Sequence, residues 1–363
     1  MRAVRFVHGF SCARSLPAGD QRSILNRDSQ IHSDRAMPYD SDHAGTVISA
    51  DPLVIYAMYA PGRPLGIAPA HAAALRGRKA LLLLALDVTI EVEGAAGELA
   101  RDLKSAQADL PDVNVVVLAN TPFEAYLLAD LRISAMPGSR SIFVDESVFK
   151  PWDGPAEFDA VYNASLTPAN RHELARDVTR LALIYDRDRS NDPNRLDELK
   201  AKLPRATFVN HAEGQGAYRH LSPEECDRHI NRARVGLCLS RTGATVAAME
   251  YMLAGLPIVS TPSRGGRERY LLPPFCRLVD DNPPAIADAV DVFVRKPVPK
   301  AVIRNHALHM LQFERTNFLI AINNLAKEFF GVETLFASFA PFQIGLISPR
   351  GPLPMQAPEK AAS

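Results

Sequence analysis

Residues 235–272, VGLCLSRTGATVAAMEYMLAGLPIVSTPSRGGRERYLL, constrain the fold of this chain more than any other stretch. They begin with a short apolar run that is typical of a buried strand, followed by a turn and a predicted helix over 244–254. Thr242 is placed to cap that helix and Gly255 to end it. A second predicted strand over 256–260 leads into a glycine-rich turn. This order of elements indicates a doubly wound α/β domain.

The turns of such a domain lie at the carboxyl ends of parallel strands and face one crevice. The backbone amides of Gly243, Ala244 and Thr245 open the predicted helix, so we expect them to bind an anion. Gly265 and Gly266 in the second turn allow a ligand to approach the backbone closely. The sequence therefore predicts a ligand site at this edge of the sheet.

Glu250 lies on a largely apolar face of the same predicted helix, four residues after Val246 and three before Leu253. A carboxylate in that position needs a polar partner. We expect the partner to be the hydroxyl groups of a ligand; the alternative is a structural pair with a buried arginine.

The pattern Ser-x-Thr-Gly-Ala, Met-Glu-Tyr-Met-Leu-Ala-Gly-Leu-Pro-Ile-Val-Ser-Thr and Gly-Gly-Arg resembles the donor-binding half of GT-B glycosyltransferases. Within that fold it is most similar to the retaining, glycogen-synthase-like family 4. The resemblance covers about residues 114–330 and is specific over 158–174 and 240–267. It implies two Rossmann-like doubly wound domains that face a cleft, a nucleotide-sugar as donor substrate, and no metal or other cofactor.

The resemblance also implies roles for single residues. The family carries two glutamates with seven residues between them. The second corresponds to Glu250, which is implied to contact the nucleotide ribose, and the first, implied to hold the donor sugar, corresponds to Thr242. An arginine and a lysine that face the diphosphate correspond to Ser165 and Asn170, neither of which is basic.

Basic side chains near these positions are candidate replacements for the two missing cations. Arg171 is the favoured candidate because it directly follows the lost lysine position. For each of these side chains the alternative is a solvated surface position. The other candidates are His172, Arg241, Arg264 and Arg267.

Two polar residues of the N-terminal part follow predicted strands. Asn120 comes after a strand over 114–119, and Asp145 comes after a short strand over 141–144. Because ligands bind beyond the carboxyl ends of such strands, we expect both near an acceptor crevice and treat them, with Arg171, as candidate catalytic residues. The alternative is that Asn120 caps a helix, which Thr121 and Pro122 begin, and that Asp145 turns the chain.

Composition changes along the chain suggest its domain organisation. Residues 1–50 are polar and without periodicity, so we expect disorder there. A short acceptor-side Rossmann-like domain is expected over 51–150 and a donor-binding Rossmann-like domain over 151–335, with Pro, Gly and Trp marking the hinge at 149–155. The Pro-rich tail over 345–363 is expected to be disordered. Either Met1 or Met37 could be the true start.

Charge and cysteine content exclude some functions. The 363 residues include 41 basic and 41 acidic ones, which argues against a nucleic-acid binder that relies on bulk charge. The four cysteines have no disulfide or zinc spacing, and Cys226 near His229 is better read as helix surface than as a metal site.

No segment reaches the roughly 20 apolar residues that span a bilayer, and no signal peptide is recognisable. We expect a cytoplasmic protein, with peripheral membrane contact through a lipid-linked acceptor left open.

These features favour a retaining glycosyltransferase that acts on an unknown acceptor. The neutral residues at three family positions keep a second hypothesis open, a degenerate pseudoenzyme that binds nucleotide-sugars or acts as a scaffold. A third, weaker hypothesis is another GT-B enzyme such as a sugar-nucleotide epimerase, whose catalytic carboxylates we cannot assign.

Overall fold

A computed structural model describes most of the chain and places Tyr39–Ser363 in one compact unit. Ala244 lies outside the described residues, and so do residues 1–44 of the segment predicted to be disordered over 1–50 and residues 347–363 of the one predicted over 345–363. The described residues are 45–59, 64–66, 68–86, 89–185, 192, 194–211, 218–243, 245–339 and 345–346.

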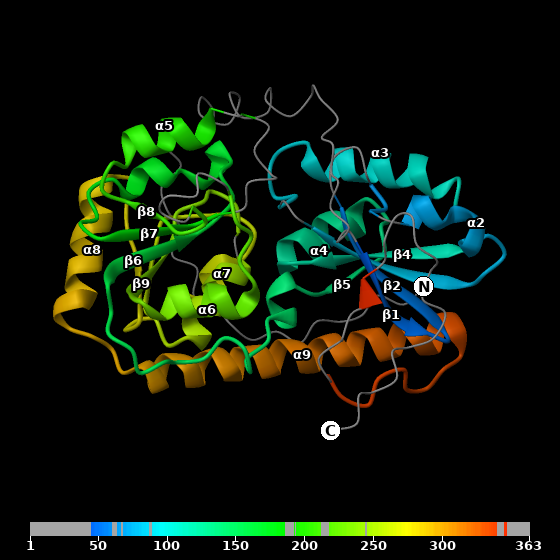
Figure 1. Ribbon diagram of the computed structural model, residues 1–363. Coiled ribbons are helices and arrows are strands. Elements are labelled where there is room, and N and C mark those ends of the chain that lie inside the picture. The colour runs from blue at the N-terminus through cyan, green and yellow to red at the C-terminus, as the bar shows by residue number, and fades with distance from the viewer. Residues whose placement is uncertain are drawn as a thin grey trace. The chain divides into compact units, whose positions relative to one another are not determined.

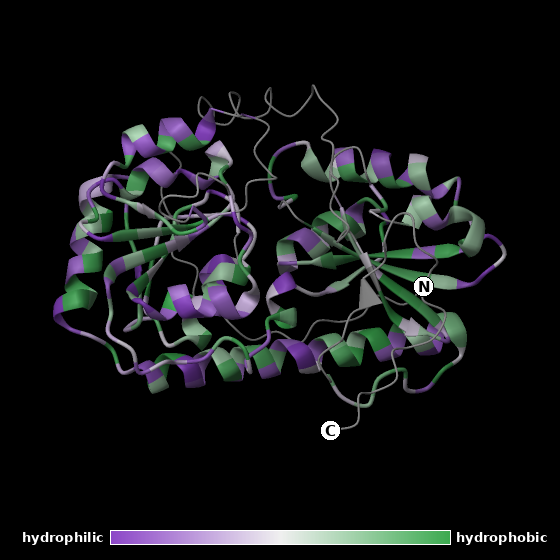
Figure 2. Ribbon diagram, in the orientation of Figure 1, coloured by the Kyte–Doolittle hydropathy of each residue, from purple (hydrophilic) through white to green (hydrophobic). Residues whose placement is uncertain are grey.

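The first of two sheets in the described part has six strands, in the order β12-β1-β2-β3-β4-β5 (Figure 1). Strands β2 to β5 run parallel, whereas β1 is antiparallel to both of its neighbours. All seven residues of β3 are buried, because a parallel strand is covered on both faces. Figure 2 shows the strands of this sheet mostly in green, the colour of hydrophobic residues. The strands are β1 Gly45–Ala50, β2 Leu53–Tyr59, β3 Ala80–Leu86, β4 Val113–Ala119, β5 Ala135–Pro137 and β12 Gly345–Leu346.

One helix of the first half, α4, begins at the cap that the sequence predicts. Thr121 accepts a hydrogen bond from the Glu124 amide through its side chain, at 3.0 Å, and Pro122 is the first residue of α4. The predicted start of this helix is therefore confirmed. The helical elements are η2 Ala68–His71, α2 Ala72–Leu75, α3 Ala95–Gln107, α4 Pro122–Asp130 and η3 Arg140–Phe143.

Two predictions for this half are wrong. The bounds of the expected disorder are wrong: Gly45–Ala50 is the strand β1, although disorder was expected through residue 50, and Gly345–Leu346 is the strand β12, although disorder was expected from residue 345. The predicted strand over 141–144 falls largely on the 3₁₀ helix η3, because Ser139 caps the segment by accepting a hydrogen bond from the Ser141 amide. The strand in this region is β5, a few residues earlier.

The second sheet is entirely parallel, with the order β11-β10-β9-β6-β7-β8. Chain order reverses between β6 and β9, which are neighbours. This is the doubly wound arrangement that the sequence predicted, and ligands bind at such a reversal beyond the carboxyl ends of the strands. The strands are β6 Phe158–Asn163, β7 Leu181–Ile184, β8 Thr207–Phe208, β9 Ala233–Cys238, β10 Ile258–Ser260 and β11 Cys276–Leu278.

Most helices of the second half also follow the sequence signals. Ser222 and Glu225 form the predicted capping box of α6, and Gly255 ends α7 in the left-handed region. The helix predicted after 163 is instead two 3₁₀ turns, η4 and η5. The helical elements are η4 Pro168–Asn170, η5 His172–Ala175, α5 Arg195–Lys202, α6 Pro223–Asn231, α7 Thr245–Leu253, η6 Arg267–Tyr270 and α8 Pro283–Arg295.

The last long helix, α9 (Lys300–Phe330), packs on α7 of the second half and on the first sheet, and can be followed in orange in Figure 1. Ile303 and Leu311 belong to the core around α7, whereas Phe318 and Ile322 belong to the core on one face of the first sheet. One continuous helix therefore contributes to the cores of both halves. In the described part of the chain, no helix has the length and hydropathy needed to cross a bilayer.

Candidate functional site

Glu250 lies in α7, close to the end of β6 at the reversal of strand order. Its Oε2 accepts a hydrogen bond from the side-chain amide of Asn163, the last residue of β6, at 3.0 Å. Burial raises the pKa of Glu250 to about 7, and the Asn163 hydrogen bond and the charge of Arg140 act against that rise. Among the described residues Oε1 has no hydrogen-bond partner, and the partner of Oε2 is an amide rather than the arginine of the alternative prediction.

Ser165 and Asn170 lie together in the turn after β6. The Asn170 side-chain amide donates to the Ser165 carbonyl at 2.7 Å and to its hydroxyl at 2.9 Å. It also donates to the Thr167 hydroxyl at 3.0 Å. The two positions at which the resemblance implies cations therefore hold neutral side chains that bind each other.

Arg171 is buried, with φ of 50°, and its guanidinium ties this turn to the neighbouring strands. Nε donates to the Leu239 carbonyl at 2.7 Å and Nη2 to the Thr261 hydroxyl at 2.7 Å. Nη1 pairs with Asp281. The expected alternative of a solvated side chain is wrong for Arg171. All three nitrogens already have protein partners, and a catalytic role stays a prediction.

Arg267 is fully buried beneath the turn that follows β9. Nη1 donates to the Ser240 hydroxyl at 2.9 Å, and Nη2 donates to the carbonyls of Ser240 and Thr261, each at 3.0 Å. Its Nε has no partner, and no carboxylate of the described residues pairs with it. A buried charge without a counter-charge is costly, so Arg267 leaves positive charge at the carboxyl ends of β9 and β10.

The diglycine turn packs against the first half of the chain. Gly265 and Gly266 have φ of 90° and 87°, and the Gly265 amide donates to Glu91 Oε2 at 3.1 Å. A Cβ atom at Gly265 would lie 3.0 Å from Thr89, and one at Gly266 would lie 2.6 Å from Thr121. The lack of side chains at these glycines lets residues of the first half approach the turn closely. That a ligand also approaches it stays a prediction.

The turn after β9 packs against the diglycine turn. Thr242 forms an isolated bridge with Arg264, and a Cβ atom at Gly243 would lie 2.6 Å from the Gly265 carbonyl oxygen. Arg241, in the same turn, is exposed. The structure thus brings together the two turns that the sequence analysis singled out, whereas a ligand site between them stays a prediction.

The start of α7 differs in detail from the prediction. The helix begins at Thr245, so Thr242 lies three residues before it and is not directly next to its first turn. Ala244, predicted as a binding residue, lies outside the described residues. The Thr245 hydroxyl hydrogen-bonds to that of Ser139 at 3.0 Å, which links the helix start to the first half.

Asn120 and Asp145 occupy different settings. The Asn120 amide donates to Glu124 at 2.7 Å, and its carbonyl accepts from Arg269 of the second half. Asp145 accepts from the amide and hydroxyl of Ser147 at 2.8 and 2.6 Å, and the hydroxyl is the main cause that lowers its pKa. Asp145 follows a 3₁₀ helix and turns the chain, as the alternative prediction had it.

Sequence reasoning missed Glu91 and Arg269, which join the two halves at this site. Glu91 lies 174 residues before its partner Gly265, and Arg269 lies 149 residues after Asn120. No local pattern marks either residue. Within the described ranges, no group of three or more His, Cys, Asp or Glu side chains is arranged to hold a metal ion.

Comparisons with known proteins bear on the fold. No protein-family model matches the sequence, and no curated protein matches it either. The chain is similar to the structure of sucrose-phosphate synthase from Thermosynechococcus elongatus, with 16% identity, 77% of this chain and 74% of that chain covered, and a TM-score of 0.54. It is also similar to Anabaena HepE in complex with UDP-glucose, with 15% identity, coverage of 77% and 78%, and a TM-score of 0.52. The predicted GT-B fold, with two Rossmann-like halves, is confirmed.

Proposed function

We propose that this protein is a glycosyltransferase that moves a sugar from a nucleotide-sugar donor to an acceptor, with retention and without a metal. The observation that carries the proposal is the position of Glu250 at the reversal of strand order, with Oε1 open. Ribose hydroxyls are hydrogen-bond donors, and a carboxylate of this kind accepts from them. The donor would then lie over the turns that follow β6 and β9.

The fold similarity to a protein solved with UDP-glucose supports a nucleoside diphosphate sugar as the donor class. The acceptor class we infer is a glycan, a lipid-linked sugar or a small molecule. In the lipid-linked case the protein would contact a membrane peripherally.

The charge around the proposed diphosphate site is lower than the resemblance implies. A missing charge-assisted hydrogen bond to phosphate costs about 1.5–3 kcal/mol, and two of them slow transfer by roughly 10²–10⁴-fold. The uncompensated charge of Arg267 and the first amides of α7 are what the described chain offers in their place. We therefore propose slow transfer.

A second candidate function is a catalytically degenerate protein that binds nucleotide-sugars. The hydrogen bonds of Asn170 to Ser165 favour it, because they give the polar groups of this turn protein partners without a ligand. The complete set of protein partners around Arg171 favours it as well.

Thermal unfolding with UDP-, GDP- and ADP-glucose tests donor binding. A donor at about 100 times its dissociation constant stabilises by about 2.7 kcal/mol, and each kcal/mol raises Tm by roughly 2–4 °C for 150–250 residues. We expect one donor to raise Tm, Glu250→Ala to abolish the rise, and Glu328→Ala, at an exposed position of α9, to keep it.

Turnover assays then separate the two candidates. Release of the nucleoside diphosphate, with an α-linked product from an α-linked donor, is the result expected of a retaining transferase. Binding without any turnover, over a panel of sugar acceptors, would leave the second candidate. A protein that melts cooperatively but shows no shift with any donor contradicts both.

A further inference from the structure

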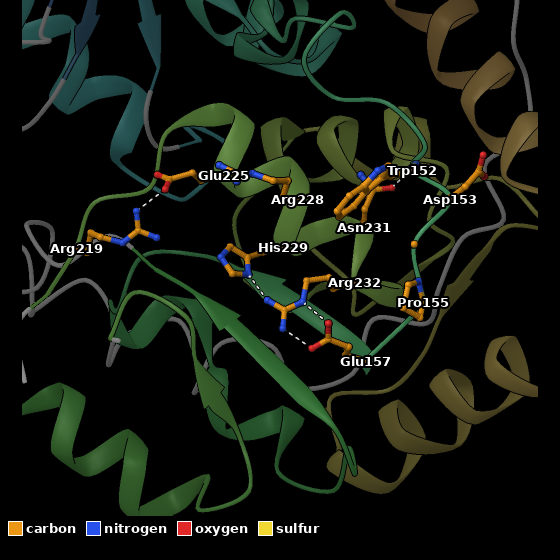
Figure 3. A pocket seen from close by; sticks show the side chains of 11 residues that line it. Trp152, Asp153, Pro155, Glu157, Arg219, Glu225, Arg228, His229, Asn231 and Arg232 are labelled. Atoms are coloured by element: carbon orange, nitrogen blue, oxygen red, sulfur yellow. Dashed lines mark hydrogen bonds and ion pairs between the residues drawn. The ribbon is translucent and has the colours of Figure 1, made fainter. Parts of the chain in front are cut away.

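A cleft of about 440 Å³ opens on the second half between α6 and the linker that precedes β6 (Figure 3). Two of its lining residues directly precede strands of the sheet, Glu157 before β6 and Arg232 before β9. The cleft therefore lies at the amino ends of the strands whose carboxyl ends lead to Asn163 and the turn at Thr242. It is distinct from the proposed donor site, and its volume is within the range of about 300–1,000 Å³ that small-molecule sites have.

Three arginines line this cleft, and two of them are paired with carboxylates. Arg219 pairs with Glu225 and Arg232 pairs with Glu157, as the dashed lines in Figure 3 show. Arg228 is exposed, and its Nε donates a 3.4 Å hydrogen bond to the backbone carbonyl of Glu224 in its own helix. Among the described residues no carboxylate forms an ion pair with Arg228, although its charge helps to lower the pKa of both Glu224 and Glu225. An anion that binds Arg228 therefore competes only with these two neighbours, neither of which forms an ion pair with it.

His229 adds an uncharged hydrogen-bond donor beside these arginines. Arg232 Nη1 donates to His229 Nδ1 at 3.2 Å. Because a guanidinium only donates, Nδ1 must accept, and the ring proton lies on Nε2. Burial, followed by the charges of Arg232, Arg219 and Arg228, lowers the pKa of His229. The ring is therefore neutral at pH 7 and has one N–H to offer.

Trp152, the only tryptophan of the chain, lines the same cleft with half of its surface exposed (50%). A Cβ atom at Gly154 would lie 3.6 Å from the indole, so the chain at 154 passes beside the ring. The Trp152 amide donates to Asn231 at 2.8 Å, and its carbonyl accepts from Lys300 at 2.9 Å. A held, half-exposed indole in a polar cleft is a surface on which a flat ring stacks.

We propose that this cleft binds a nucleoside monophosphate, with the base on Trp152 and the phosphate at Arg228 and the Nε2–H of His229. Stacking and a charge-assisted phosphate contact are the two recognition elements that the cleft brings together. Asp153 also lines the cleft and offers a carboxylate to the ribose hydroxyls. The proposal does not rest on the proposed transferase activity.

Trp152 fluorescence measures this binding directly, because no other tryptophan contributes to the signal. The full chain is titrated with UMP and AMP, and in parallel arms with uridine, adenosine and inorganic phosphate. We expect a saturable change with a monophosphate and at least tenfold weaker binding of its nucleoside. A signal that is as strong with the nucleoside, or no saturable signal at millimolar monophosphate, overturns the proposal.

Matched variants separate this cleft from the donor site. We expect Arg228→Gln to weaken monophosphate binding at least tenfold, which corresponds to about 1.4 kcal/mol. Arg295→Gln removes the same charge at the exposed end of α8 and should leave binding unchanged. Glu250→Ala should also leave the signal unchanged. Loss of the signal in Glu250→Ala with retention in Arg228→Gln would assign it to the donor site and overturn the proposal.

Discussion

Three ionisable side chains near the carboxyl ends of the second sheet, two of them buried (Arg171 and Arg267) and one partly buried (Glu250), differ in how their charge is balanced. Arg171 has a carboxylate partner in Asp281, whereas Arg267 has neutral acceptors around it. Glu250 has one amide partner and a pKa of about 7. A ligand that brings negative phosphate and hydroxyl donors would balance the last two at once.

Replacing Glu250 with Gln should change how stability depends on pH. Because the folded-state pKa of about 7 lies above the ordinary value of 4.5, the folded wild-type protein holds the extra proton between these values. Its stability therefore falls as pH rises through that window. Gln does not titrate, so the free energy of unfolding of Glu250→Gln should not fall in this way. Relative to wild type it should rise by on the order of 2 kcal/mol between about pH 5 and pH 8. Urea unfolding at both pH values measures it; an equal difference at both would contradict the assigned pKa.

Arg171→Met should destabilise the protein, because it removes hydrogen bonds to two strand ends and leaves their acceptors buried. We expect a loss of about 2–4 kcal/mol in the free energy of unfolding. Arg295→Met, at an exposed position, should stay within about 0.5 kcal/mol of wild type. Denaturant midpoints give both values, and a loss no larger than the control's would mean that the buried network contributes nothing.

At the scale of elements, packing of α7 onto β9 depends on one small residue. A Cβ atom at Gly236 would lie 2.3 Å from the ring of Tyr251, so the helix can approach the strand only because residue 236 is glycine. The Tyr251 hydroxyl in turn accepts a hydrogen bond from the backbone N–H of Asn163 at 2.6 Å. The position of Glu250 is thus set by its neighbour in the same helix.

Gly236→Ala and Gly97→Ala should have opposite effects. The first forces α7 away from β9 and should cost about 1–3 kcal/mol. Gly97 lies inside α3, where an added Cβ would have a nearest neighbour 3.8 Å away, so Ala should stabilise by about 0.5–1 kcal/mol. Thermal unfolding of both variants checks the pair, and a stabilised Gly236→Ala would show that the contact is not tight.

Elements with local signals were predictable, and those set by distant partners were not. The starts of α8 and α4 follow from local signals, Asn282 before Pro283 in one case and Thr121 before Pro122 in the other. The short apolar run at 141–144 suggested a strand, but the Ser139 cap turns it into 3₁₀ helix. Strand β1 is stabilised by pairing with β2, and no residue pattern within 45–50 predicts that pairing.

The same division applies to the candidate site. The position of Glu250 beside the end of β6 follows from helix periodicity and strand order, which the sequence carries. The contacts of the diglycine turn do not, since Glu91 reaches it from the other half of the chain. Likewise, spacing in the sequence ranks Arg171 above Arg267 as a candidate. Only the structure shows that Arg171 is paired with Asp281 and that the Nε of Arg267 has no partner.

On the scale of the whole described unit, polar contacts join the halves beside the site. Glu91 accepts from the Gly265 amide and from the Thr121 hydroxyl, and its carbonyl accepts from Arg264 at 3.2 Å. Arg269 reaches the Asn120 carbonyl. Glu91 therefore occupies an amide of the diglycine turn that a ligand anion would otherwise bind.

Glu91→Ala should loosen this junction without unfolding either sheet. We expect faster hydrogen exchange over residues 263–270, by about tenfold for a lost contact of about 1.4 kcal/mol. Exchange in β3 should stay unchanged. Glu93→Ala, at an exposed position two residues away, is the control. Equal exchange in both variants would mean that Glu91 does not hold the turn.

Because the far end of α9 covers the first sheet, the order of synthesis matters for folding. Val54 and Leu81 share a core with Phe318 and Ile322, and translation at about 5–20 residues per second delivers the latter roughly ten seconds or more after the former. During that interval the nascent sheet lacks part of its cover on that face. A chain that stops before α9 should consequently aggregate as it leaves the ribosome, even though most of its strands have been made.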